Sequence, residues 1–173
     1  MTRALLVVDV MLGIFDLGVD LHRGEAFLAN IELLISRARA ARVPIVFVQH
    51  TGAEGSPFAP DAPGRTIHPR VAPRAGETII QKRQPDSFQD TSLESVLREQ
   101  GIEELVICGF ASEACVDTTV RSAYAKGFTN ILVSDAHTTT RNPVLEAAQI
   151  VAHHNFVLSR FAKVLRHDEV LLD

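Results

Sequence analysis

An acid, a lysine and a thiol lie at or just beyond the ends of three short apolar runs. Asp9 follows LLVV, Lys82 ends TIIQK, and Cys115 follows ELVICGF within the turn ASEAC. A carboxylate can take a proton, an ammonium group can balance negative charge, and a thiol can attack a carbonyl carbon. The three side chains therefore predict a nucleophilic site with a base, a cation and a nucleophile. The alternative for each residue alone is structural: a loop-anchoring acid, a solvated strand end and a small buried thiol.

Cys115 has the strongest local argument of the three. Ser112 is a good N-cap residue, so we expect a helix to begin there and to place Cys115 in its first turn. Free backbone N–H groups and the positive end of the helix dipole stabilise a thiolate at such a position, and they can also receive a developing oxyanion. The other cysteine, Cys108, lies inside an apolar run and is predicted to be inert core.

The elements that must position these residues are short apolar runs, rich in β-branched residues, that alternate with helical patterns. Strands are predicted at 4–10, 44–50, 78–82, 104–110, 130–135 and 156–159. Helices are predicted at 25–42, 92–100, 112–126 and 143–154. Strand followed by helix, repeated, is typical of parallel βαβ units in an α/β fold, here a three-layer α/β/α sandwich. Ligands of such folds bind beyond the carboxyl ends of the strands, which is where the three candidate residues lie.

The composition is that of an ordinary globular protein. The chain has 173 residues, 46% of them apolar and 22% charged, and we expect a single domain over 1–173. The net charge of -4, without a long basic run, argues against nucleic acid or an anionic membrane as the primary partner. Two cysteines make no disulfide framework, and the N-terminal apolar run is too short for a signal peptide or a membrane span. We therefore expect a cytoplasmic protein.

Two further features bear on binding and assembly. The segment 51–76 holds five prolines and four glycines with little periodicity. So long an irregular segment is typically functional, and here it is expected to lie over the carboxyl edge of the sheet and to set specificity. The mean hydropathy of +0.12 and the apolar residues of 161–173 predict excess apolar surface, and hence a homo-oligomer.

The order of several motifs resembles the isochorismatase-like cysteine hydrolase superfamily, which includes nicotinamidases and carbamoyl-amide hydrolases. The motifs are LLVVDV with Asp9, IHPRVAPRAGETIIQKRQPDSF with Lys82, the turn GFASEACV with Cys115, TTVRSAYAKGF, and SDAHTT. They run over nearly the whole chain. Each motif is weak alone, whereas their order and spacing together are specific.

The resemblance implies a catalytic triad. Asp9 would be the general base, Lys82 the cation that holds the thiolate form, and Cys115 the nucleophile that attacks an amide-type carbonyl and forms a thioester. It also implies a six-stranded, mostly parallel sheet of order 3-2-1-4-5-6, a cis peptide bond between Phe110 and Ala111, and dimers or tetramers. The backbone N–H groups of Ala111 and Cys115 would then form an oxyanion hole.

The expected ligand is a small amide or carbamoyl compound, with no cofactor and no metal. Candidate substrate contacts are Phe15, His50, Phe110 and His137, with a structural hydrogen bond as the alternative for His137. Met11 stands where the family usually has Gln, so a side-chain amide contact to substrate is lost there. Metal-dependent nicotinamidases carry Asp-x-His after the second strand, but here His50 lacks that aspartate. His50 and His68 alone make no convincing zinc site.

Three other functions stay open on the sequence. One is a hydrolase of the same family acting on another type of bond, and a second is a catalytically silent binding or assembly protein on the same fold. Intact Asp9, Lys82 and Cys115 argue against the silent protein, and the reactivity of Cys115 would distinguish the two. A flavodoxin-like or nucleotide-binding domain ranks last because no G-x-G-x-x-G occurs.

Overall fold

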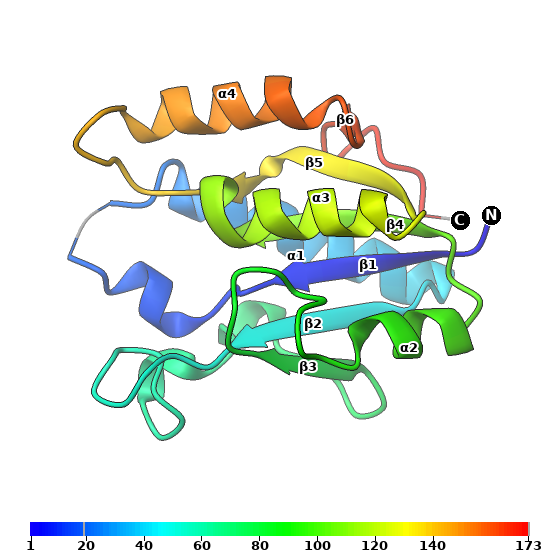
Figure 1. Ribbon diagram of the computed structural model, residues 1–173, viewed down its shortest axis with the longest axis horizontal. Helices are drawn as coiled ribbons and strands as arrows, with labels where there is room; N and C mark the ends of the chain where they lie inside the picture. Colours follow the sequence, from blue (N-terminus) through cyan, green and yellow to red (C-terminus); the bar gives the residue numbers. More distant parts are fainter. Residues whose placement is uncertain (19, 173) are drawn as a thin grey trace.

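Strands and helices alternate along the computed structural model, which describes residues 1–18 and 20–172 (Figure 1). The strands are β1 (Arg3–Val8), β2 (Ile45–His50), β3 (Thr78–Lys82), β4 (Glu104–Phe110), β5 (Thr129–Thr138) and β6 (Lys163–Leu165). The α-helices are α1 (Gly24–Ala41), α2 (Leu93–Glu99), α3 (Asp117–Ala125) and α4 (Ala147–Leu158). Short 3-10 turns are η1 (Leu12–Phe15), η2 (Pro63–Arg65) and η3 (Pro69–Val71), and η4 (Ser112–Val116) is a π-helical turn that leads into α3.

All six strands run parallel in the order β3-β2-β1-β4-β5-β6, which confirms the expected topology. α1 covers one face of the sheet, and α2, α3 and α4 lie on the other (Figure 1). The strand order reverses between β1 and β4, which are direct neighbours. Crossovers leave these two strands in opposite directions, so a crevice forms beyond their carboxyl ends.

The alternation of side chains along the central strands builds two cores. Leu5 and Val7 of β1 face α1, whereas Leu6 and Val8 face α2 and α3. Because both faces of β1 are covered, its sequence is a continuous apolar run, as expected for a parallel strand. β1 ends at Val8, so Asp9 is the first residue beyond it.

The last predicted strand was placed wrongly. Residues 156–158 form the end of α4, and the sixth strand is β6, farther along the chain. Leu158 is buried while Phe156 is exposed. Residues two apart share one face of a strand but lie on nearly opposite faces of a helix, so this difference in burial fits a helix packed on one side. The helix also begins later than predicted, at Ala147, because Glu146 and Gln149 form a capping box there.

Part of the apolar C-terminal segment is internal. Val170 and Leu172 pack into the core on the α1 side, and Arg37 of α1 donates hydrogen bonds to the carbonyls of His167 and Val170. Leu171 is exposed, and Asp173 lies outside the described residues. The hydropathy of this segment therefore supports an oligomer less than expected, and the oligomer stays a prediction. Among the described residues, no helix is both long and apolar enough to cross a bilayer.

The segment 51–76 folds against the end of β1. Met11 pairs with Ile67 in an antiparallel bridge, and the His68 N–H donates to the Val10 carbonyl at 2.9 Å. The Thr66 carbonyl accepts a hydrogen bond from the N–H of Leu12 at 2.8 Å. The segment therefore lies at the carboxyl edge of the sheet, as its composition and position predicted.

Candidate active site

Asp9 is placed by the point at which β1 stops. Its N–H donates to the Val48 carbonyl at 3.0 Å, which continues the ladder to β2 for one more residue. Its φ of 53° then takes the chain out of the strand, a left-handed conformation that Asp tolerates better than most residues. The side chain is 2% exposed. A carboxylate so deeply buried needs a compensating charge.

Lys82 supplies that charge. Its Nζ lies 2.7 Å from Asp9 Oδ2 and donates to the carbonyls of Gln84 and Pro85 at 3.1 and 3.0 Å. In register, Lys82 stands beside His50 of β2, so two strand positions separate β3 from β1. The long stem of lysine bridges that gap, and the residue is 1% exposed. Lys82 is therefore not a solvated strand end.

Cys115 comes from the turn between β4 and α3. Gly109, with φ 131°, is needed before this turn because a Cβ there would lie 2.0 Å from the Val8 carbonyl oxygen. The peptide bond between Phe110 and Ala111 is cis, as the resemblance implied. η4 then carries Cys115 to the start of α3, where the thiol lies within hydrogen-bonding reach of Asp9 and Lys82.

The helix start differs from the prediction in one respect. Ala111, not Ser112, is the N-cap residue, and it makes no side-chain cap. Ser112 lies inside the π-helical turn, fully buried, and its hydroxyl bonds to His137. The reason is tertiary: the neighbouring strand offers Ser112 a better partner than its own helix does.

Burial is the largest cause of the pKa shifts of Asp9 and Cys115. It raises the pKa of the Asp9 carboxyl above its usual value, while the Lys82 charge and hydrogen bonds from Lys82 and Cys115 oppose the rise. Burial, and then the Asp9 charge, raise the pKa of the Cys115 thiol to about 11, against the opposing effect of Lys82. These effects favour the neutral form of the Cys115 thiol, whereas the position of Cys115 at a helix start predicted a stabilised thiolate.

Candidate oxyanion donors lie in the same turn. The Ala111 carbonyl accepts from the N–H groups of Ala114 and Val116, each at 3.1 Å. The Ala111 N–H itself donates to no group among the described residues. The N–H of Cys115 follows within η4. A carbonyl oxygen approaching Cys115 would therefore find an uncommitted N–H group nearby.

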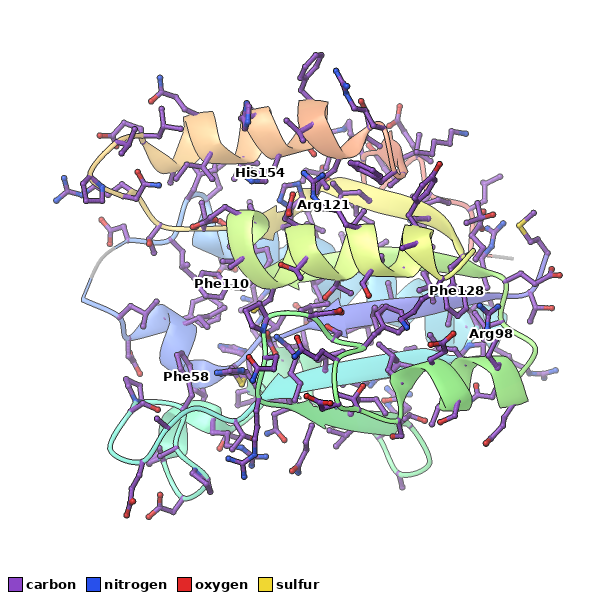
Figure 2. The ribbon with its side chains drawn as sticks, viewed as in Figure 1. Phe58, Arg98, Phe110, Arg121, Phe128 and His154 are labelled. Atoms are coloured by element: carbon purple, nitrogen blue, oxygen red, sulfur yellow. The ribbon has the colours of Figure 1, made fainter. Side chains whose placement is uncertain are left out.

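Several of the candidate substrate contacts lie at or beyond the carboxyl ends of the strands. Phe58 and Phe110 lie at the end of the sheet to which the strand arrows point (Figure 2), and both are partly buried against the core, as is Phe15. The ring of His50 stands 6.3 Å from that of Phe58, edge to face. His50 Nδ1 is buried and has no hydrogen-bond partner among the described residues.

The charge state of His50 follows from its surroundings. Burial lowers its pKa, the Asp9 charge opposes this, and Lys82 adds to the lowering. His68 is engaged elsewhere: its ring packs 5.0 Å from that of Phe15, and its Nδ1 accepts from the Arg70 N–H. In the described part of the chain, no three His, Cys, Asp or Glu side chains gather as metal ligands.

His137 has the structural role that was its alternative. It is 3% exposed, and its two ring nitrogens are taken by Ser112 and Asn155. It therefore has no free nitrogen for a substrate. Cys108 is fully buried, and burial raises the pKa of its thiol, in keeping with an inert core residue.

A cavity of about 390 Å³ includes Lys82 in its wall, whereas Asp9 and Cys115 are not among its lining residues. Apart from Lys82, its lining residues were not predicted one by one; only the 51–76 segment was expected to contribute to binding. Its other lining residues come from the 51–76 segment and from the chain around Lys82: Thr51, Pro60, Arg65, Gln81, Arg83, Gln84, Gln89 and Asp90. The motif QKRQPDSFQD contains most of them, and this cluster of polar residues around Lys82 was the feature of the sequence from which the cavity could have been predicted.

The comparisons agree on one family. The family model described as the Isochorismatase domain matches residues 3–169. The chain is 41% identical over 144 residues to the uncharacterised isochorismatase family protein YddQ of Bacillus subtilis (strain 168), covering 81% of this chain and 79% of that protein. A crystal structure of an isochorismatase from Pseudomonas putida KT2440 superposes with a TM-score of 0.94 at 32% identity, covering 98% of this chain and 90% of that one.

A relative with a named activity is also similar. The streptothricin hydrolase of Streptomyces noursei is 38% identical over 137 residues, which cover 79% of this chain. The match covers 54% of that enzyme, so the chain spans about half of its length.

Proposed function

The chain belongs to the isochorismatase-like hydrolase family, and from that premise we propose that it is a cysteine hydrolase of small amide or carbamoyl-type C–N bonds. The observation that carries the proposal is the buried Asp9–Lys82 ion pair of 2.7 Å beside the Cys115 thiol. A buried ion pair is weak evidence for stability, so its place beside a nucleophile favours a chemical role.

Hydrolysis proceeds in two halves. Asp9 takes the proton of the Cys115 thiol as Sγ attacks the carbonyl carbon, and the new oxyanion receives hydrogen bonds from the Ala111 and Cys115 N–H groups. The C–N bond then breaks, Asp9 returns the proton to the leaving nitrogen, and a thioester remains on Sγ. Asp9 next takes a proton from water, the hydroxide attacks the thioester carbon, and the acid product leaves as Cys115 regains its proton.

In this mechanism Lys82 supplies the positive charge beside Asp9 while Asp9 gains and loses a proton. Its charge offsets the carboxylate throughout the cycle, and its three oxygen contacts keep it in place. Because burial raises the pKa of Asp9, the difference between that pKa and the Cys115 pKa of about 11 is smaller than for an ordinary carboxyl. The free energy needed to move the proton from the thiol to Asp9 during the attack is therefore lower. A base matched to its task in this way is typical of general base catalysis.

The surroundings support a small substrate. The cavity of about 390 Å³ beside Lys82 is near the lower end of ligand pockets. Phe15, Phe58 and Phe110 are partly buried against the core, and His50 Nδ1 has no hydrogen-bond partner among the described residues. The streptothricin hydrolase similarity supports hydrolysis as the class of reaction.

Ammonia release from a panel of small amides and carbamoyl compounds tests the proposal. Wild type should hydrolyse at least one compound, and Cys115→Ala should abolish its turnover while the circular dichroism spectrum is kept. Cys108→Ala is the matched control because it removes the other thiol, which is fully buried. Mass spectrometry of quenched wild type should find the acyl group on the peptide that contains Cys115. Full activity in Cys115→Ala would refute the thiol mechanism, and inactivity on every compound would favour a silent binding protein.

A further inference from the structure

A hydrogen-bond network of three polar side chains, two of them buried, joins the Cys115 turn to β5 and α4, and none of the proposed chemical steps uses it. Ser112 Oγ lies 2.8 Å from His137 Nδ1, and His137 Nε2 lies 2.9 Å from Asn155 Oδ1. Ser112 and His137 are buried, so neither is reached by substrate. Ser112 is the first residue of η4, three positions before the nucleophile.

The donor and acceptor of each hydrogen bond in this network follow from the contacts of Asn155. Asn155 Nδ2 donates to the Ser134 carbonyl at 3.1 Å, so Asn155 Oδ1 faces His137 and must accept. His137 therefore carries its proton on Nε2, and its Nδ1 accepts from the Ser112 hydroxyl. Burial lowers the pKa of His137 to about 4, which agrees with a neutral ring holding a single proton.

An irregularity in β5 brings His137 to this place. Ile107 of β4 pairs with Leu132, but Gly109 pairs with His137, so residues 133–136 stand opposite the single residue Cys108. The extra residues bulge the strand and move His137 level with the start of the turn. Bulges of this kind commonly re-aim a side chain beside a functional site.

A second contact ties the next residue of the turn to the same strand end. Thr139 Oγ1, just beyond β5, donates to Glu113 Oε1 at 2.8 Å. Two successive residues of the turn, Ser112 and Glu113, are thus bonded to β5 and the residue after it. The turn that carries Cys115 is therefore held from its side by groups remote in sequence.

We propose that Ser112, His137 and Asn155 are positioning residues that hold the Cys115 turn so that Sγ and the oxyanion donors point at one carbonyl group. This inference rests on the proposed hydrolase function, since it concerns the aim of the nucleophile. The physical reason is that a misplacement of about 1 Å can lower a rate by about a hundredfold. A hydroxyl bonded to a ring that is itself anchored on α4 prevents such a displacement.

The test compares three single variants. Ser112→Ala removes the donor to His137, Ser112→Thr restores a hydroxyl, and Thr138→Val is the matched control. Thr138 is fully buried at the end of β5, and its hydroxyl donates to the His22 carbonyl rather than to a residue of the turn. Ser112→Ala should lower kcat at least about tenfold with KM within about twofold, whereas Ser112→Thr and Thr138→Val should keep kcat within about threefold of wild type. An unchanged kcat in Ser112→Ala, or an equal loss in Thr138→Val, would overturn the proposal.

A second readout needs no substrate. Iodoacetamide should alkylate Cys115 at least about twice as fast in Ser112→Ala as in wild type, because a loosened turn exposes more of the partly buried Cys115 side chain. Ser112→Thr and Thr138→Val should react at the wild-type rate. If no amide is hydrolysed, the proposed function fails, yet this comparison still decides whether the three residues position the thiol.

Asn155→Ala keeps the test valid if Ser112→Ala fails to fold. Asn155 is partly exposed on α4, and its amide contacts His137 and the Ser134 carbonyl rather than the Cys115 turn. The variant should lower kcat by about threefold or more, and it should speed alkylation of Cys115, both through His137 alone. If kcat and the rate of Cys115 alkylation in Asn155→Ala both equal the wild-type values, the proposal that Asn155 acts on the turn through His137 is refuted.

Discussion

Replacing Lys82 by methionine should destabilise the fold mainly through the charge left on Asp9. Methionine is unbranched and of similar length, so the packing along the lysine stem is largely kept. The Asp9 carboxylate is 2% exposed and loses its ion pair of 2.7 Å. The two carbonyls that Nζ also contacts belong to exposed residues, Gln84 and Pro85, where water can replace the lysine.

The magnitude follows from the cost of breaking a buried pair. Removing one partner of such a pair typically costs about 3–5 kcal/mol, and we expect Lys82→Met to lose that much free energy of unfolding at neutral pH. Adding Asp9→Asn removes the uncompensated charge, so the double variant should be more stable than Lys82→Met alone. The coupling between the two sites should be at least about 2 kcal/mol.

The pH dependence has a definite sign. Without Lys82 the folded pKa of Asp9 rises further above its unfolded value, because the first cause, burial, is no longer opposed by the lysine charge. A carboxyl whose folded pKa is raised destabilises the fold above that pKa, and the penalty disappears as the pH falls below its unfolded value of about 3.9. The difference between wild type and Lys82→Met should therefore shrink steadily as the pH is lowered from neutral.

Urea denaturation measured across this pH range provides the assay. The midpoint should fall in Lys82→Met without a change of m-value, which would report lost stability rather than altered compactness. The reasoning fails if Lys82→Met loses less than about 1 kcal/mol, or if the effects of Lys82→Met and Asp9→Asn simply add.

Four further outcomes are expected. The rate of Cys115 alkylation should keep rising with pH towards about 11, the pKa of this partly buried thiol, and a plateau near neutral pH would contradict this. Gly109→Ala should cost well over about 1 kcal/mol in a thermal melt because its Cβ would meet the Val8 carbonyl at 2.0 Å; an unchanged melting temperature would count against the geometry of the turn. Burial alone would raise the pKa of Asp135, but hydrogen bonds from the His167 ring and backbone lower it, so His167→Ala should be less stable than wild type at neutral pH and the gap should close as the pH falls through the folded pKa of Asp135. Amide hydrolysis should survive exhaustive chelation with EDTA, and its restoration by zinc alone would show a metal requirement.

Local patterns were sufficient to predict most of the fold. Continuous apolar runs located five of the six strands, and the helix ends predicted at residues 100 and 126 lie one residue beyond the ends of α2 and α3. The run at 156–159 misled because a short apolar stretch has no period long enough to tell a strand from the end of a helix. The strand was predicted wrongly because the local sequence at 156–159 is compatible with both a strand and the end of a helix.

The sequence alone determined which residue types stand at the carboxyl ends of the strands, including Asp9, Lys82 and Cys115. It could do so because a strand end is a local event, marked where an apolar run stops. Only the tertiary structure decided what those residues meet. It brought Lys82 across β2 to Asp9, turned Ser112 from a helix cap into a partner of His137, and buried the Cys115 thiol until its pKa rose to about 11. Burial and charge contacts depend on neighbours far apart along the chain, and no local pattern of residues encodes them.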